Sequence, residues 1–446
     1  RSGVARAFAG SAEGYAAAMS PQATAIKKNS ARDLRLVTVG QGVSLVGDAI
    51  TTLALPIVAV DLLNADSLGT GLLGAASTVA YLLIGLQAGV WIDRSSRRAF
   101  LIAADTARVL LLLAVPALYL IGALTLPALI AIEAGLGAAT VFFQIAMPAY
   151  LPRLASGDRL VALNARLVVL GEGAGFVGPG IAGILIGILS APIVLVVDAL
   201  SFALSALSLA RIRTPEPPAP RRAEHSVAKD LREGVRALWR RPLLRLITLE
   251  AVNGNVAFSI MMGQSIIFQR LDLGFSPAII GFIASAGFLG GVIGGLLSPR
   301  LTKRFGFGRV IFLTTILFGL DEFLQPLAAV AATELRLPLV LANFFLGGLF
   351  LMIYVVPVST FRQLVIPDRL LGRVMGVNRM ATWGAGATVG FAAGGVIANA
   401  TDRPTALIIG AVMQTLVPLA MFGGARIWRH RTIAAAVASD TRAAAR

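Results

Sequence analysis

Long apolar stretches alternate with short polar connections over most of this chain. A helix needs roughly 20 consecutive apolar residues to cross the hydrocarbon core of a bilayer. Twelve segments meet this length: 35–62, 69–92, 99–122, 126–151, 160–187, 191–211, 244–269, 276–299, 308–330, 337–361, 372–399 and 404–427. The pattern predicts an all-α membrane protein with 12 transmembrane helices, and the even count places both termini on one side.

The basic residues indicate which side that is. Nearly all Lys and Arg lie in the two tails and in alternate connections, near 94–98, 153–166, 211–245, 300–309 and 362–379. The opposite connections hold only Arg270, Arg336 and Arg403. Because short connections rich in Lys and Arg remain on the cytoplasmic side, we expect both termini to be cytoplasmic.

Composition supports the membrane assignment and narrows the chemistry. The chain is 57% hydrophobic and 14% charged, whereas about a quarter of an average soluble domain is charged. A formal charge of +16 would suggest nucleic acid in a soluble protein, but here the basic residues lie in connections, so the expected partner is the lipid bilayer and not nucleic acid. Cysteine is absent and His225 and His430 lie in hydrophilic segments, so we expect neither a metal nor a cofactor.

The longest hydrophilic stretch divides the spans into two sets of six. We predict a disordered tail at 1–34, a first six-helix half at 35–211, a cytoplasmic linker at 212–243, a second half at 244–427 and a C-terminal tail at 428–446. The linker begins with a Pro-rich segment, which favours an extended backbone. Residues 226–241 then show helical amphipathic spacing. This helix would either lie on the inner leaflet or form a linker with solvated charges.

The two halves share features at offsets of 206 to 214 residues. Pro148 corresponds to Pro357, the Asp-Arg-Leu at 158–160 corresponds to that at 368–370, and Asn164 corresponds roughly to Asn378. A glycine followed by a basic cluster occurs at 89–98 and again at 295–309. Parallel repeats of this kind place a substrate site between the halves near the middle of the membrane.

The segment GVWIDRSSRR, residues 89–98, resembles the signature between helices 2 and 3 of the major facilitator superfamily of transporters. GPGIAG in helix 5 resembles the antiporter motif of its exporters, with Gly175, Gly178, Pro179 and Gly183 as helix-packing positions. GQGVSLVGDAITTLALPIVAV in helix 1, MPAYLPRLASGDRLVALNAR at the helix 4–5 turn and DLREGVRALWRRPLLR before helix 7 resemble the subgroup of bacterial macrolide-efflux and enterobactin-exporter proteins. This resemblance implies two pseudo-symmetric halves, a monomer in the bacterial plasma (inner) membrane, and alternating access.

The resemblance also implies a conformational gate. Asp93 would hold the cytoplasmic side closed by meeting the start of helix 11, which offers Arg373 and Arg379, and Gly89 would let the helices touch. The remaining basic residues of the cluster are Arg94, Arg97 and Arg98. The alternative is that Asp93 only pairs with Arg97 in its own connection. One family feature is missing, because Ala131 occupies the helix 4 position where proton-coupled exporters often carry arginine.

Polar residues within the spans are the candidates for the substrate and proton pathway. An acidic group in a membrane is costly and usually faces a cavity or a partner. Gln41, Ser44 and Asp48 share one face of helix 1, which lines the central cavity in the family. The other candidates, on helices 4, 5 and 7, are Glu133, Glu172, Glu250 and Asn253.

Several further charges have structural interpretations. Glu250 could instead pair with Arg245 or Arg241, and Asp105 is spaced to pair with Arg108. For Asp198, Asp321 and Glu322 we favour structural pairing, because helices 6 and 9 are peripheral in the family.

No enzyme motif is present: the chain contains no Gly-x-Ser-x-Gly, no Walker loop and no His or Cys cluster. The family resemblance, together with the acidic residues on helices 1, 4 and 5, implies a secondary active exporter of an amphiphilic or cationic small organic compound of the drug, macrolide or siderophore type, driven by proton antiport. Two alternatives remain, a lipid or lysolipid translocator on the same fold and a non-transporting membrane receptor or assembly factor.

Overall fold

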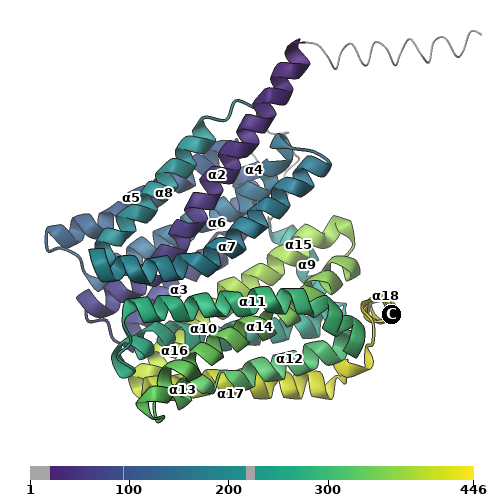
Figure 1. Ribbon diagram of the computed structural model, residues 1–446. Helices are drawn as coiled ribbons and strands as arrows, with labels where there is room; N and C mark the ends of the chain where they lie inside the picture. The colour runs from purple at the N-terminus through teal and green to yellow at the C-terminus, as the bar shows by residue number, and fades with distance from the viewer. Residues whose placement is uncertain (1–20, 94, 217–226, 446) are drawn as a thin grey trace, which may run out of the picture.

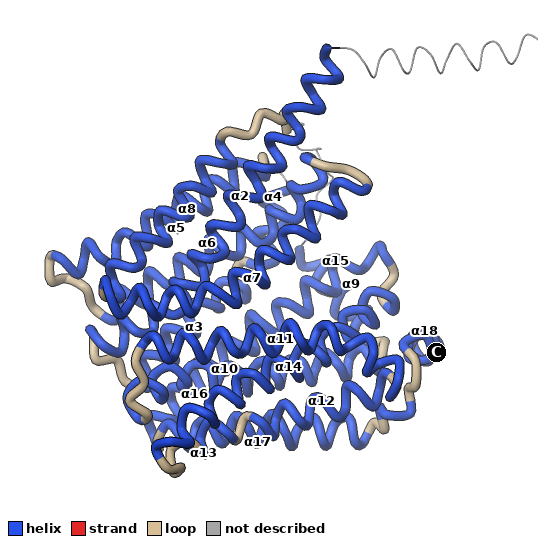
Figure 2. Tube along the Cα trace, in the orientation of Figure 1, coloured by secondary structure: helices blue, strands red, loops and turns tan. Residues whose placement is uncertain are grey.

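The computed structural model describes residues 21–93, 95–216 and 227–445, and every regular element in these ranges is helical (Figure 2). The first half contains α2 (Pro21–Ile57) with its π-helical continuation η1 (Val58–Leu62), α3 (Ser67–Leu83), α4 (Gly85–Asp93), α5 (Arg97–Leu120), α6 (Leu126–Leu154), α7 (Asp158–Leu189) and α8 (Ala191–Ala210). Helix α9 (Val227–Trp239) connects the halves.

The second half repeats this order. It contains α10 (Pro242–Ile267) with the π-helical η2 (Phe268–Asp272), α11 (Pro277–Phe305), α12 (Phe307–Asp321), α13 (Leu324–Leu327), α14 (Thr333–Val365), α15 (Asp368–Arg379) with the π-helical η3 (Met380–Gly386), α16 (Ala387–Ala400), α17 (Arg403–Gly424), η4 (Ile427–Arg429) and α18 (Ile433–Ala445). Figure 1 shows the halves as two bundles that lie against each other.

Eleven helices of the described residues are long and apolar enough to cross a membrane. The predicted span 69–92 is divided at Ile84, which leaves the helical region between α3 and α4. The predicted connection at 300–309 is wrong, because α11 continues to Phe305 and only Gly306 separates it from α12. Gly306 has a φ of +92°, which side-chain-bearing residues rarely adopt, so a single residue makes the turn.

The predicted disordered tail is also too long. Helix α2 begins at Pro21, so the tail boundary at residue 34 is wrong, while residues 1–20 lie outside the described residues. The carboxylate of Asp33 is buried and accepts hydrogen bonds from the backbone N–H groups of Arg213, at 3.2 Å, and Thr214, at 2.9 Å. This contact fastens the start of the first half to the end of α8.

The halves meet along two helix pairs, α3 with α16 and α7 with α11. A Cβ atom on Gly71 would lie 2.6 Å from the Phe391 carbonyl oxygen, and one on Gly183 would lie 2.4 Å from the Pro277 carbonyl oxygen. Glycine is therefore what allows these backbones to approach so closely. The ion pair of Asp61 and Arg270, at 2.9 Å, joins the halves at the same rim.

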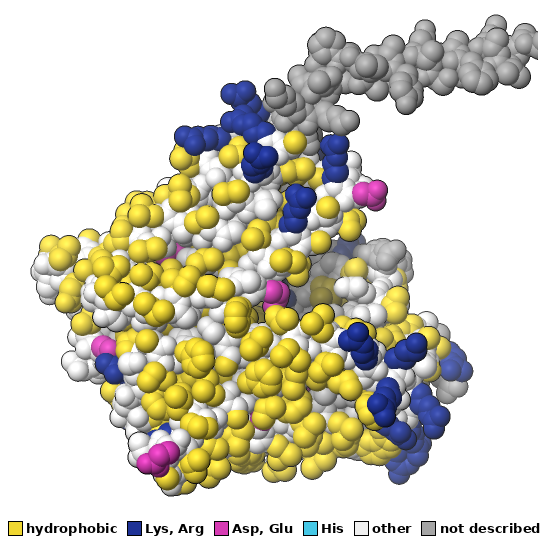
Figure 3. All heavy atoms as spheres, viewed as in Figure 1, with side chains coloured by type: hydrophobic (Ala, Val, Ile, Leu, Met, Phe, Trp, Pro, Cys, Tyr) yellow, Lys and Arg dark blue, Asp and Glu magenta, His cyan; other side chains and the backbone are white. Residues whose placement is uncertain are grey.

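The opposite ends of the halves diverge. In Figure 1 the bundles separate toward the end that carries α9 and α15. Figure 3 shows most of the Lys and Arg side chains of this face gathered at that end of both bundles, with a hollow between them. The close contacts between the halves thus lie at the rim that carries Asp61 and Arg270, and the basic residues lie at the opposite end.

Helix α9 packs against the second half instead of standing free. Its Gly234 lies close to α15, where a Cβ atom would be 2.9 Å from the Arg373 carbonyl oxygen. Leu238 is buried in a core cluster of the second half, whereas Trp239 is exposed. The second half therefore covers part of the predicted apolar face of α9. Only the rest of that face is available to an inner leaflet.

The C-terminal segment contains a docked helix, α18. Its Asp440 is buried and accepts a hydrogen bond from the Leu243 N–H at 2.7 Å, at the first turn of α10. Ala436 on the same helix is fully buried in the core cluster. Burial raises the pKa of the Asp440 carboxyl, so the docked state favours the neutral acid.

This contact predicts a pH dependence with a definite sign. Since the docked pKa of Asp440 exceeds its ordinary value, docking of α18 weakens as pH rises from that ordinary value through the raised one. Asp440→Asn keeps the acceptor without the charge and should remove this pH dependence. Asp440→Leu leaves the Leu243 N–H unpaired and should weaken docking by about 1–3 kcal/mol. The mobility of a spin label at Ala438→Cys measures docking; equal mobility in all variants would contradict the prediction.

Candidate functional site

A cavity of about 460 Å³ lies between the two halves. Most of its wall comes from α2, α3, α5, α6 and α8 of the first half, and α10, η3 and α16 of the second half close it. The residues that line it with polar groups are Asp48, Thr51, Thr52, Thr70, Ser77, Thr78, Tyr81, Arg108, Glu133, Thr140, Gln144 and Asp198. All of these polar side chains belong to the first half.

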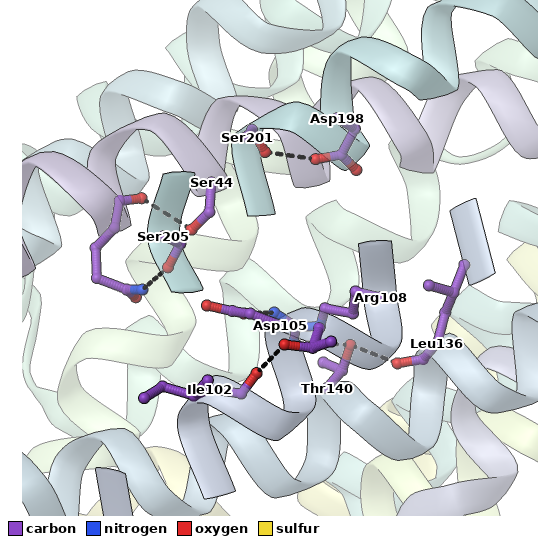
Figure 4. Close-up of polar contacts among 11 residues, drawn as sticks. Ser44, Ile102, Asp105, Arg108, Leu136, Thr140, Asp198, Ser201 and Ser205 are labelled. Atoms are coloured by element: carbon purple, nitrogen blue, oxygen red, sulfur yellow. Dashed lines mark hydrogen bonds and ion pairs between the residues drawn. The ribbon is translucent and has the colours of Figure 1, made fainter. Parts of the chain in front are cut away.

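The cationic group of this wall is Arg108, which is 4% exposed. Its guanidinium contacts the Asp105 carboxylate at 3.3 Å and donates to the Thr140 hydroxyl at 3.1 Å (Figure 4). It also lies 4.9 Å from the ring centroid of Phe143 and 4.7 Å from that of Phe202. Ion pairing and cation–π contacts on both sides hold this charge in place.

Two carboxylates on the wall differ in their surroundings. Asp198 accepts hydrogen bonds from the hydroxyls of Ser201, at 2.8 Å, and Thr51. Gly47 provides the space for it, because a Cβ atom there would overlap the Asp198 carboxylate. Glu133 has one carboxylate oxygen that is buried and accepts no hydrogen bond from the described residues. A buried, unpaired carboxylate oxygen is costly, so Glu133 is a candidate to bind a proton or a cation.

The facing wall is apolar. Met262 and Ile266 extend from α10, and Trp383 and Phe391 come from η3 and α16. The cavity therefore offers carboxylates on one side and aromatic and aliphatic surface on the other. This arrangement can receive a molecule that has both a polar or cationic group and an apolar body.

The polar face predicted on helix 1 only partly reaches the cavity. Asp48 lines it, but Gln41 and Ser44 are buried against α8, where Gln41 donates to the Ser205 hydroxyl at 3.5 Å. Ser44 donates to the Gln41 carbonyl at 3.2 Å. The same face of α2 thus meets α8 at one level and the cavity two turns further on, so shared spacing does not give a shared environment.

Glu133 lines the central cavity as predicted, but Glu172, Glu250 and Asn253 lie apart from it. Glu250 is buried and accepts a hydrogen bond from the Tyr354 hydroxyl, and Asn253 donates to the Met413 carbonyl at 3.4 Å. The alternative ion pair of Glu250 with Arg241 or Arg245 is not formed among the described residues: Arg241 donates to the Val365 carbonyl, and Arg245 lies over Trp239. Glu172 is exposed and lines a second cavity.

The packing positions predicted on helix 5, which is α7 in the structure, face neighbouring helices. A Cβ atom on Gly175 would overlap the Phe288 ring of α11, and one on Gly178 would lie 2.4 Å from the Ala49 side chain of α2. The Pro179 carbonyl oxygen lies 2.2 Å from the position that a Cβ atom on Gly281 would take. The contacts of Gly175, Pro179 and Gly183 with α11 place these positions at the junction of the halves, whereas Gly178 packs within the first half.

Only part of the predicted gate lies within the described residues. A Cβ atom on Gly89 would meet nothing within 4 Å, so no helix touches there. Arg94 and the side chain of Asp93 lie outside the described residues. Arg373 forms an ion pair with Glu233 of α9, and Arg379 reaches the first half, where it donates to Gln144.

Glu216 of the linker contacts the start of α5, beside the basic cluster. Glu216 accepts hydrogen bonds from the Ser96 hydroxyl at 2.6 Å and from the backbone N–H groups of Arg97 at 2.9 Å and Arg98 at 3.3 Å. The Arg98 guanidinium donates to the Leu209 carbonyl at 2.8 Å. A carboxylate at a helix N-terminus is stabilised by the unpaired N–H groups and the helix dipole.

Sequence reasoning missed Arg108 and Asp198 as cavity residues. The interpretation of Arg108 as the partner of Asp105 was correct but incomplete, because the same side chain also lines the cavity. The signal was available, since an arginine within an apolar span marks a functional site by default.

Comparison with known proteins identifies the family. Residues 37–271 match the family described as Major Facilitator Superfamily, and residues 181–406 match its MFS_1 like family. The chain belongs to the major facilitator superfamily. It is therefore a transporter and not an enzyme, and a multi-pass protein of the bacterial plasma membrane.

Individual proteins agree with this assignment. The chain is 29% identical over 393 residues to the multidrug efflux pump Tap of Mycolicibacterium fortuitum, covering 84% of this chain and 92% of the relative. It is 24% identical to the uncharacterized MFS-type transporter YfiS of Bacillus subtilis, covering 90% and 95%. This superfamily member thus resembles a drug-efflux subgroup.

Solved structures share the fold. A bacterial homologue of the iron transporter ferroportin in an inward-facing state superposes with a TM-score of 0.73 at 16% identity, covering 90% of this chain and 99% of that one. The nucleoside transporter NupG gives 0.69 at 16% identity, covering 88% and 99%. At these identities the likeness concerns the fold alone.

Proposed function

We propose that this superfamily member is a secondary active exporter of an amphiphilic cation, driven by proton antiport. The observation that carries the proposal is the central cavity, in which Asp48, Glu133 and Asp198 face Trp383 and Phe391. The guanidinium of Arg108 is already compensated by Asp105. With that pair neutral, the remaining carboxylates favour a positively charged substrate, and the printed description of the Mycolicibacterium relative as a multidrug efflux pump agrees with this class.

Proton exchange follows because protons and the cationic substrate compete for the same carboxylates of the cavity wall. A carboxylate that loses its proton can receive the cation, and reprotonation then releases it. Arg108 supplies from α5 the buried arginine that helix 4 lacks at Ala131, because it contacts Thr140 on α6 and lies on the same cavity as Glu133.

The proposed topology has 12 spans, with α3 and α4 together forming the second, and both termini in the cytoplasm. The basic residues near Arg98 and Arg373 support this orientation. The closed rim of Asp61 and Arg270 then faces outward, and the diverging ends face the cytoplasm, so the structure is the inward-facing state of an alternating-access cycle.

Single cysteines test the orientation, since the chain has none of its own. Ser95→Cys should react with a membrane-impermeant maleimide only in inside-out vesicles, and Thr401→Cys only in intact cells. Both positions are exposed, so accessibility is matched. Labelling of both from the same side would overturn the proposed topology.

Transport is tested in inside-out vesicles with a cationic dye. Acidifying the lumen by respiration should drive dye uptake, and a protonophore should abolish it. Uptake that persists without a gradient would contradict antiport, and gradient-independent movement of a labelled lipid instead of the dye would replace the proposal with lipid translocation. If neither the dye nor the lipid moves, the exporter proposal fails.

A further inference from the structure

A second cavity, of about 340 Å³, lies within the second half. Its wall consists of residues of α10, α11, α12, α13 and α14, and Glu172 of α7 is the lining residue from the first half. Met262 lines both this cavity and the central one. Because almost all of its wall belongs to one half, this cavity does not need the two halves to meet in order to exist.

The large apolar side chains of this second cavity's wall are mainly aromatic and sulfur-containing. Four phenylalanines, Phe258, Phe288, Phe318 and Phe344, line it together with Met261, Met262 and Met352. Glycines on α11 and α14, including Gly287, Gly291 and Gly347, leave the space unfilled where side chains would stand. Aromatic faces attract cations, and methionine adapts to ligands of different shape.

A buried carboxyl completes the wall. Glu322 is 7% exposed, lines the cavity, and accepts a hydrogen bond from the Asn343 amide at 3.1 Å on one oxygen. The break between α12, which ends at Asp321, and α13, which begins at Leu324, brings it there. Among the residues that line the cavity none is Lys, Arg or His. The carboxyl thus lacks the cation that a buried carboxylate requires.

We propose that this second cavity binds a lipophilic aromatic monocation, with Glu322 as its charged partner, independently of the central cavity. The positive charge would lie near Glu322 and the ring system between the phenylalanines, as the amphiphilic lining demands. The inference goes beyond the proposed function, because equilibrium binding to purified protein needs neither a gradient nor transport. A failure here therefore leaves the transport proposal standing, and the reverse also holds.

The cysteine-free chain allows a direct test with ethidium as the probe. Gly291→Cys places a thiol on the cavity wall, where a Cβ atom makes only ordinary contact, 3.5 Å from Met352. Gly424→Cys, at a position where a Cβ atom meets nothing within 4 Å, serves as the control thiol. Ethidium should slow the reaction of the Gly291→Cys thiol with a small methanethiosulfonate, which forms a mixed disulfide and releases methanesulfinate, and leave Gly424→Cys unaffected. The uncharged phenanthridine should protect far less.

Matched carboxyl substitutions assign the charge. Glu322→Gln can still accept the Asn343 hydrogen bond and should raise the ethidium concentration needed for protection at least about tenfold, whereas Glu133→Gln in the central cavity should not change it. Filling the cavity with Gly291→Leu in the unlabelled protein should remove the Glu322-dependent part of ethidium binding measured by fluorescence.

Four results would each overturn the proposal: a Gly291→Cys thiol that does not react without ligand, protection that is unchanged by Glu322→Gln, protection that is lost with Glu133→Gln, and equal protection by phenanthridine.

Discussion

Replacing Glu133 by Gln is expected to abolish proton-driven efflux while the protein is still made and inserted. The side chain lines the central cavity, and one of its oxygens has no hydrogen-bond partner among the described residues. Glutamine keeps the shape but can neither bind nor release a proton. We expect the gradient-dependent rate of dye transport in inside-out vesicles to fall at least about tenfold, which corresponds to about 1.4 kcal/mol.

The matched control is Glu334→Gln, which makes the same chemical change in the first turn of α14, at an exposed position. This variant should transport at the wild-type rate. Dye binding to Glu133→Gln, measured without a gradient, distinguishes two causes. Normal binding would indicate that a proton carrier is lost, and weakened binding would indicate that a substrate contact is lost. A Glu133→Gln protein that transports at the wild-type rate between pH 6 and pH 8 would show that Glu133 is not the proton carrier.

The substitution Gly71→Ala is expected to open the rim at which the halves meet. The added Cβ atom would lie 2.6 Å from the Phe391 carbonyl oxygen and 2.7 Å from the Gly395 Cα. Both neighbours are backbone atoms, so no side chain can rotate away. Overpacking of this kind costs about 1–3 kcal/mol, which would shift the balance between the two access states by about 5- to 150-fold.

Spin labels measure this shift directly. Labels on Asn64→Cys and Thr401→Cys, on opposite sides of the rim, should move apart in Gly71→Ala, and dye transport should fall. Gly89→Ala is the matched control, because a Cβ atom there meets nothing within 4 Å in this structure. An unchanged distance distribution in Gly71→Ala would refute the prediction. A similar shift in Gly89→Ala would instead mean that any added methyl group perturbs the helix.

The features that follow from one-dimensional patterns could be predicted. Apolar runs gave the membrane helices, because their length is dictated by the bilayer. The motif from Gly89 to Arg98 gave the family, which the comparison confirmed. What failed were boundaries: Gly306 makes a turn of one residue where the basic cluster suggested a loop, and α2 starts before the predicted tail ends.

The site was harder to predict because it depends on helix rotation and crossing. Gln41 and Asp48 lie on one face of α2, yet α8 covers the first and the cavity meets the second. Helix 6, which is α8 in the structure, was expected to be peripheral. Asp198 of this helix nevertheless reaches the cavity beside Thr51, because Gly47 has no side chain that would overlap its carboxylate. Helix 9 was expected to be peripheral as well, and Glu322 lines a cavity that no spacing in the sequence indicates.

The ion pair of Asp61 and Arg270 has a consequence for the surroundings in which the transporter works. It joins the two halves at the closed rim, and its side chains remain 27% and 32% exposed. Attraction between exposed charges is screened by dissolved ions, over a distance of about 8 Å at physiological ionic strength and about 3 Å at 1 M. The attraction that joins the two halves at this rim therefore weakens as the salt concentration of the surrounding medium rises. In the proposed orientation, the ease of outward opening would therefore depend on the salt content of the habitat.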